Sequence, residues 1–251
     1  MNGKDETARD RAMSSIRSNI EEHGHHVYVV SGGACPKYLY SIGLRETLGF
    51  ELIWAGAAYF TYGDAGYVLN RIAEQLKFKK QSVEDEFLID GEAVYSLRDV
   101  NPTWPRELWL GALDYYDIDH VPVVQIVPEE KYQTLDIPNL SRNWDRESEP
   151  IWRWMNEKWE YPVPEASTAA TNLDALKGKK ITQAIRWEKD YWEIFAGSPS
   201  DVAKEDGRVL PLGTLMGIDE SLEAVVHLEI EQGIWRDSEE SDWNEWDLTE
   251  E

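Results

Sequence analysis

The sequence predicts an α+β protein of two domains, each a mixed or mostly antiparallel sheet with flanking helices. Short β-rich runs alternate with segments of helical spacing over the first 130 residues, and a second set of such runs follows a stretch broken by prolines. We therefore place an N-terminal domain at residues 1–142 and a Pro- and Trp-rich junction at 143–172. A small C-terminal domain with an acidic tail follows at 173–251.

The first elements follow from residue spacing. Apolar residues three and four apart predict a helix from Ala8 to Ile20, which Gly24 ends. Three β-rich runs separated by Gly and Pro then predict strands, at residues 25–31, 38–44 and 51–60. Helical spacing returns after them and predicts a second helix at residues 64–80.

Turn residues define the rest of the N-terminal domain. The Asp90–Gly91 pair, flanked by apolar runs, predicts a β-hairpin within residues 86–100. Proline is typical of the first position of a helix, so Pro105 predicts that a helix begins there. The apolar run at residues 121–127 then predicts a buried strand.

The C-terminal domain shows the same kinds of signal. Residues 181–189 and 191–197 predict two strands joined by a tight turn. Asp219 is placed to cap a helix that begins at residue 220 or 221. A last strand is predicted at residues 233–237, before the tail.

Composition narrows the class of protein. The 48 acidic and 25 basic residues give a net charge of −23, which disfavours binding to nucleic acid and to anionic membranes. The apolar content of 42% indicates a folded core. The chain contains no run of about 18 apolar residues, so no membrane-spanning helix is predicted. The charged N-terminus does not resemble a signal peptide. We therefore expect a cytoplasmic globular protein, whose single cysteine, Cys35, excludes an internal disulfide.

Acidic residues are concentrated toward the C-terminus, where they alternate with tryptophan. Residues 1–147 hold 24 acidic and 15 basic side chains, whereas residues 148–251 hold 24 and 10. Rings beside carboxylates suit a surface that binds a basic protein, because rings supply contact area and carboxylates steer association. The predicted partner-binding residues are Trp235, Asp237, Glu239, Glu240, Asp242, Trp243, Glu245, Trp246 and Asp247.

Other tryptophans have a simpler interpretation. Trp54, Trp109 and Trp192 lie in apolar runs and are expected in the cores. For the tryptophans from Trp152 to Trp159, packing between the domains is favoured over partner binding. Trp243 and Trp246 have an alternative as well, a tail that folds back on the domain.

Catalytic and metal sites find weak support. His23, His25 and His26 cluster before the first strand, but adjacent strand residues point to opposite faces, which is a poor spacing for one metal ion. A zinc site would have to recruit His120, Glu51 or Asp119 from elsewhere in the chain. We predict no metal site and no cofactor, since the glycines match no phosphate-binding motif.

An enzymatic alternative depends on His120. This residue follows Asp117 and Asp119 just ahead of the predicted buried strand, where a carboxylate-oriented imidazole acts as a general base in many active sites. The simpler interpretation is that His120 bonds backbone while Pro122 fixes the start of the strand. We predict no catalytic residues and keep His120 with Asp119 or Asp117 as the alternative, a hydrolase or transferase.

Four motifs in order resemble a bacterial family known only as domain of unknown function 4262. They are His23–Gly24, the run Tyr38–Leu44, Glu51–Ile53 with Gly56, and the run His120–Gln125. The resemblance covers about residues 10 to 130. This chain has Ser41 where the family has Thr, Phe50 where it has Pro, and Asp119 in place of the first of two histidines.

The C-terminal region resembles a small domain of bacterial immunity proteins in polymorphic toxin systems. The similar segments begin at Trp192, Leu212 and Asp219 and extend to Arg236. This resemblance implies an immunity protein, which binds and blocks a cognate toxin, here one expected to be basic. A scaffold role would predict self-association and has no specific sequence feature behind it.

Overall fold

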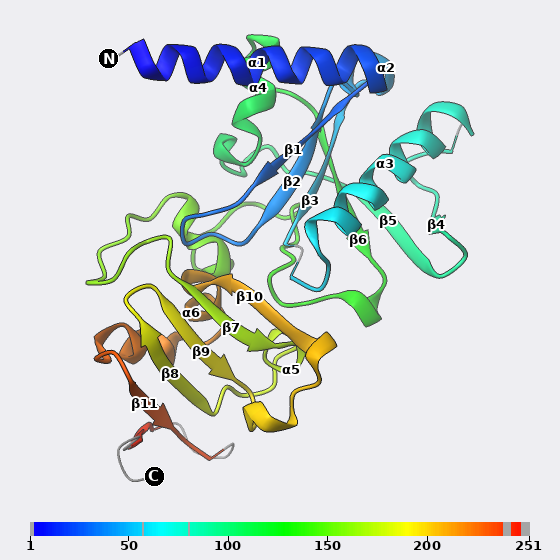
Figure 1. Ribbon diagram of the computed structural model, residues 1–251. Coiled ribbons are helices and arrows are strands. Elements are labelled where there is room, and N and C mark those ends of the chain that lie inside the picture. Colours follow the sequence, from blue (N-terminus) through cyan, green and yellow to red (C-terminus); the bar gives the residue numbers. More distant parts are fainter. Residues whose placement is uncertain (1–2, 57, 80, 238–241, 247–251) are drawn as a thin grey trace.

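Two β-sheets of six strands each, one after the other along the chain, form the framework of the protein (Figure 1). The structure is a computed structural model, which describes residues 3–56, 58–79, 81–237 and 242–246. Helices accompany both sheets, so the predicted α+β class is confirmed. Among the helices of these residues, none is long and apolar enough to cross a lipid bilayer.

The N-terminal sheet has the strand order β1-β2-β3-β6-β5-β4. Neighbouring strands are antiparallel except β3 and β6, which are parallel. The strands are β1 (His26–Val30), β2 (Tyr38–Ile42), β3 (Glu51–Ala55), β4 (Phe87–Ile89), β5 (Ala93–Asp99) and β6 (Val123–Pro128). The accompanying helices are α1 (Gly3–His23), α2 (Arg45–Leu48), α3 (Tyr62–Phe78), η1 (Arg106–Trp109), α4 (Leu110–Tyr116) and η2 (Glu130–Tyr132).

Both faces of this sheet are covered, which explains why β2, β3 and β6 read as continuous apolar runs. Leu52 and Trp54 of β3 pack in one cluster with Leu69 and other residues of α3. Ile53, between them, packs on the opposite face in a cluster that includes Ile16 of α1 and residues of η1 and α4. The N-terminal domain therefore has three layers, with the sheet in the middle.

Most predicted elements of this domain are present, with shifted ends. Helix α3 begins at Tyr62 rather than residue 64, because Thr61 and Asp64 form a capping box. The expected hairpin turns at Asp90 and Gly91, which have φ of 52° and 76°. The predicted strand 51–60 was too long, since β3 ends at Ala55.

Gly56 is the physical reason for that early end. Its φ is +72°, and a Cβ at this position would lie 2.1 Å from the carbonyl oxygen of Asp136. Only glycine allows the chain to leave the sheet here while a second segment passes so closely. The segment that follows, at Ala58, joins the core of the C-terminal sheet.

The C-terminal sheet has the strand order β10-β7-β9-β8-β11-β12. Its pairs are antiparallel except β7 with β9. The strands are β7 (Thr168–Asn172), β8 (Gln183–Glu188), β9 (Tyr191–Phe195), β10 (Gly207–Pro211), β11 (Gln232–Trp235) and β12 (Asn244–Trp246). The helices are η3 (Pro150–Met155), α5 (Leu173–Leu176), η4 (Pro199–Asp201), η5 (Lys204–Asp206), α6 (Leu212–Ile218) and η6 (Glu220–His227).

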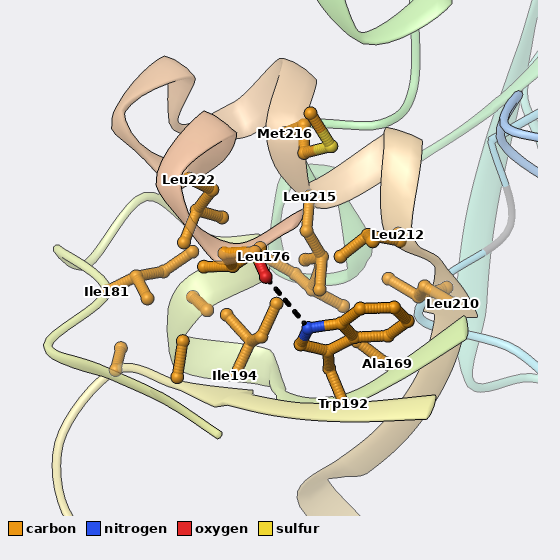
Figure 2. Packing of buried hydrophobic residues seen from close by; sticks show 14 of the residues in the cluster. Ala169, Leu176, Ile181, Trp192, Ile194, Leu210, Leu212, Leu215, Met216 and Leu222 are labelled. Carbon is orange, nitrogen blue, oxygen red and sulfur yellow. Dashed lines mark hydrogen bonds between the residues drawn. The ribbon is translucent and has the colours of Figure 1, made fainter. Parts of the chain in front are cut away.

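One face of this sheet builds the C-terminal core under α6 and η6. Figure 2 shows the Trp192 ring among aliphatic side chains, with its indole N–H donating to the carbonyl oxygen of Val225 at 3.2 Å. The helix expected after Asp219 is the 3-10 helix η6, and the Asp219 side chain accepts from the N–H of Ser221 as predicted. Strand β7 lies in the segment assigned to the junction.

The junction tryptophans pack inside the protein. Trp152 is fully buried in the core of the N-terminal domain, and its indole N–H donates to the carbonyl oxygen of Asp136 at 2.9 Å. Trp154 is buried too and donates to the carbonyl oxygen of Gly213 of α6 at 3.1 Å. Trp154 therefore contacts the C-terminal region, whereas Trp152 belongs to the core of the N-terminal region. The exact domain boundaries stay a prediction.

Candidate partner-binding surface

The residues predicted to bind a partner lie in and around β11 and β12. Trp235 ends β11, and Trp246 ends β12, which pairs with β11. The exposed acids of the set are Asp237, Asp242 and Glu245. The remaining predicted acids, Glu239, Glu240 and Asp247, lie outside the described residues.

Trp235 and Trp246 lie on the same face of the sheet. Trp235 is opposite Asn244, and Trp246 is opposite Gly233. Residues two apart on a strand share a face, so the two rings project to the same side. They are 41% and 39% exposed, and together with Asp237 they line a surface groove of about 620 Å³.

This face is the one opposite the core of Figure 2. Trp192 and Ile194 of β9 point toward α6 and η6, so Glu193 between them points away. The register places Glu193 beside Ile185 of β8, and Ile185 beside Gly233. The surface that carries the two tryptophans therefore continues across the sheet.

The same register extends the surface to the other edge strand. Val209 of β10 is opposite Ala170, which is opposite Glu193, and Val209 is 50% exposed. We call this surface the open face and define it by Tyr191, Glu193, Val209, Trp235 and Trp246; Ile185 lies between them in the register but is buried. Tyr191 and Val209 were not among the predicted partner-binding residues, although the alternation of residues 191–195 indicated that this strand has two faces.

Carboxylates lie among the rings of the open face. Burial raises the pKa of the Tyr191 hydroxyl, and the nearby charges of Glu193 and Glu188 raise it further. Asp237 lines the groove beside both tryptophans. The surface thus combines large apolar area with negative charge, which suits a basic protein partner.

Arg236, the buried residue directly after β11, connects the end of this strand to the core of the domain. Arg236 is only 4% exposed. Its guanidinium group pairs with Asp219 and donates to the carbonyl oxygen of Ile181 at 2.8 Å. The ring of Trp243 lies over the guanidinium carbon at 4.0 Å, so this predicted partner-binding residue folds back on the domain. These contacts anchor the residue that follows Trp235 to the core of the domain.

His120 and its two predicted carboxylate partners are not joined to one another. His120 is exposed and lines a cleft of about 350 Å³ with residues of β6 and the turn before β3. Asp119 instead pairs with Arg106 at 3.3 Å, and Asp117 is an exposed left-handed residue that ends α4. Among the described residues, no hydrogen bond or ion pair joins His120 to Asp117 or Asp119, and the enzymatic alternative stays a prediction.

Glu51, one of the residues considered for a zinc site, has other partners. No group of three or more possible metal ligands occurs in the part of the chain that the structure describes. The Glu51 carboxylate is buried under five hydrogen bonds. Burial likewise raises the pKa of the Cys35 thiol to about 12, as expected for a cysteine with no activating neighbour.

Two of the family motifs meet at Glu51. Its carboxylate accepts from the hydroxyls of Ser41 and Tyr116, and Ser41 in turn accepts from the N–H of Leu52 at 2.8 Å. The other donors are the backbone N–H groups of Gly43, Leu44 and Arg45. Burial raises the pKa of Glu51, and these hydrogen bonds oppose the rise by favouring the carboxylate. The motifs thus fix the turn after β2 against β3.

Comparison with known proteins bears on this N-terminal part. Residues 19–134 match the model of a family described as domain of unknown function (DUF4262). The family resemblance of the N-terminal region is confirmed. No curated protein and no solved structure matches the chain. The family match ends before the C-terminal sheet, whose resemblance to immunity proteins stays a prediction.

Proposed function

We propose that this chain is an acidic immunity protein, which binds and neutralises a cognate bacterial toxin domain of basic charge. The open face is the observation that carries the proposal, because two tryptophans on adjacent strands stay about 40% exposed there. A soluble domain ordinarily buries such rings, and exposed apolar patches mark interaction sites. We place the interaction in the cytoplasm, where an immunity protein meets its toxin.

Charge supports the same proposal. The chain carries a net charge of −23, so it attracts a basic protein over a long range and speeds the encounter. Exposed acids lie close to the tryptophans in the chain: Asp237 follows β11, Asp242 precedes β12, and Glu245 lies within β12 on the face opposite to Trp246. Toxin domains that attack nucleic acids are commonly basic, and an acidic inhibitor covers such a cationic site without any catalytic group.

A first experiment tests whether a partner exists. The tagged full chain is co-purified with the product of the adjacent gene, and binding is titrated at increasing salt. We expect a complex whose association slows as salt screens the charges. Absence of any complex with neighbouring gene products would count decisively against the proposal.

A second experiment tests the surface. Trp235→Ala and Trp246→Ala should each weaken the complex by about 30-fold, the effect of losing an interface hot spot of about 2 kcal/mol. Phe78→Ala is the matched control, because Phe78 is an exposed ring, 79% accessible, on α3 of the other domain. Equal binding by all three variants would place the interface elsewhere.

Charge-reversal variants test whether the C-terminal acids speed the association of the chain with its partner. Changing Asp237, Asp242 and Glu245 to Lys should slow association. The control changes Glu84, Glu86 and Glu92 to Lys, since these exposed acids of the N-terminal domain alter the net charge by the same amount. If both triple variants associate at the same rate, local steering by the C-terminal acids is wrong.

A further inference from the structure

A pocket of about 960 Å³ lies where α1 ends and β1 begins. Thr47 and Leu48 of α2 and the last turns of α3 complete its walls. The volume falls within the range of small-molecule sites. This pocket belongs to the N-terminal domain, so the inference goes beyond the proposed function and does not depend on it.

Two imidazoles of the pocket are held by amide side chains. The Nε2 atom of His25 lies 2.8 Å from Oδ1 of Asn70, and Nδ1 of His26 lies 2.8 Å from Nδ2 of Asn19. Burial lowers the pKa of both imidazoles, which favours the neutral rings. Because Nδ1 of neutral His26 accepts from Asn19, its Nε2 carries the hydrogen and can donate to a ligand.

Lys77 brings a positive charge to the same pocket. Its ammonium group donates to the carbonyl oxygen of Gly24 at 3.1 Å, and the N–H of Gly24 donates to the carbonyl oxygen of Ile20 at 2.8 Å. These contacts cap the C-terminal end of α1 and offset its negative partial charge. An ammonium group has three hydrogens, so two remain for a ligand.

Burial lowers the pKa of Lys77, and the charge of Glu51, whose carboxylate already accepts five hydrogen bonds, opposes that shift. Glu74 lines the pocket, but its carboxylate pairs with Arg71 at 2.5 Å. The groups that act on the pKa of His25 are Asn70, Lys77 and His23, and none of them is a carboxylate. In a chain with a net charge of −23, the pocket lining holds one ammonium group, Lys77, and one carboxylate, Glu74, so it is far less acidic than the chain as a whole and offers hydrogen-bond donors from Lys77 and His26.

Apolar side chains form the rest of the wall. Val27, Leu48 and Leu76 line the pocket, and Phe78 stands at its side with 79% of its surface exposed. A ligand that covered this ring would remove apolar area from water. The pocket thus offers polar donors and an apolar surface together.

We propose that this pocket binds a small organic anion, whose carboxylate or phosphate group contacts Lys77 and His26 and whose apolar part packs on Phe78. The donors recognise the anionic oxygens, and the aliphatic and aromatic wall selects a ligand with an apolar group over a bare inorganic ion.

Phenyl phosphate is the probe, because it joins both features in one molecule. The full chain, with 15N-labelled histidines, is titrated and followed by NMR. We expect saturable shifts of the three pocket histidines, His23, His25 and His26, whereas His120 and His227 stay unmoved because they do not line the pocket. Benzyl alcohol, which has the ring without the charge, should bind at least about tenfold more weakly.

Variants test the assigned contacts. Lys77→Met should weaken phenyl phosphate binding by about tenfold, the loss of one charge-assisted hydrogen bond, and Lys77→Arg should retain it. Lys79→Met is the matched control, since Lys79 is exposed at the end of α3 and does not line the pocket. Thr47→Glu, at an exposed position that also lines the pocket, should weaken binding by charge repulsion without any change at Lys77.

Three results would overturn the proposal. They are the absence of saturable shifts at the pocket histidines, equal binding of benzyl alcohol, and unchanged affinity in both Lys77→Met and Thr47→Glu. Circular dichroism of the free variants shows whether each is folded. If Lys77→Met fails to fold, Thr47→Glu decides by itself.

Discussion

Replacing Glu51 by Gln tests whether the family motifs have a structural role. The substitution keeps the size of the side chain and exchanges one oxygen for an amide NH2 group. In the native structure, Oε1 accepts from the backbone N–H groups of Gly43 at 2.9 Å and Arg45 at 3.0 Å. Oε2 accepts from the N–H of Leu44 at 3.3 Å. Either orientation of the amide therefore sets its NH2 group against at least one backbone donor.

The expected cost follows from this geometry. The amide is best placed with its NH2 at the Oε2 position, where the Ser41 hydroxyl can rotate to accept and only the N–H of Leu44 loses its acceptor. A buried donor without an acceptor costs about 1–3 kcal/mol, and the remaining bonds lose the strength that a charged acceptor gives. We expect Glu51→Gln to lower the free energy of unfolding by about 2–4 kcal/mol.

Urea unfolding, followed by tryptophan fluorescence and circular dichroism, measures this change. Glu46→Gln is the control, because Glu46 lies on the adjacent helix α2 and is exposed. Surface substitutions of this kind change stability by less than about 0.5 kcal/mol. If Glu51→Gln also stays within that range, the hydrogen bonds at Glu51 do not stabilise the turn after β2, and the reasoning is refuted.

Two further predictions concern stability. Arg236→Met should lower the free energy of unfolding by about 3–5 kcal/mol, because Asp219 loses a buried partner, and a loss below 1 kcal/mol in urea unfolding would contradict the anchoring role. The pKa of His25 is lowered by burial, so the unfolded chain takes up more protons below about pH 6.5, and stability should fall between pH 7.5 and 5.5. The fall should be smaller in His25→Gln, and an equal fall in both proteins would exclude His25 as its source.

The sequence by itself determined the local elements of this protein. Strand β3 and helix α3 follow from apolar spacing, and the hairpin at Asp90 and Gly91 follows from turn chemistry, because these signals depend on neighbouring residues alone. The cap at Asp219 belongs to the same class. The four motifs in order also sufficed to recognise the resemblance that the family match over residues 19–134 confirms.

Elements whose pairing partners lie far away in the chain could not be predicted from local signals. Strand β7 has the sequence TAATN, which contains no large apolar residue and lies in a Pro-rich stretch. It becomes a strand because β9 and β10 pair with it on both sides. Arg236 likewise read as a lone cation among eight acids of the last twenty residues, yet Asp219 and the carbonyl oxygen of Ile181 bury it.

The candidate surface was predictable only in part. Alternation in a strand shows that two faces exist, and the sequence singled out Trp235 and Trp246 for their acidic neighbours. Which face the helices cover is decided by packing, so the exposure of Val209 and the burial of the Trp243 ring over Arg236 appear only in the folded chain. The pocket histidines show the same limit, because Asn70 and Lys77 reach them from a helix some fifty residues away in the sequence. The spacing of apolar residues determines whether a segment can form a helix or a strand. Contacts between distant segments determine which of its side chains are exposed to solvent.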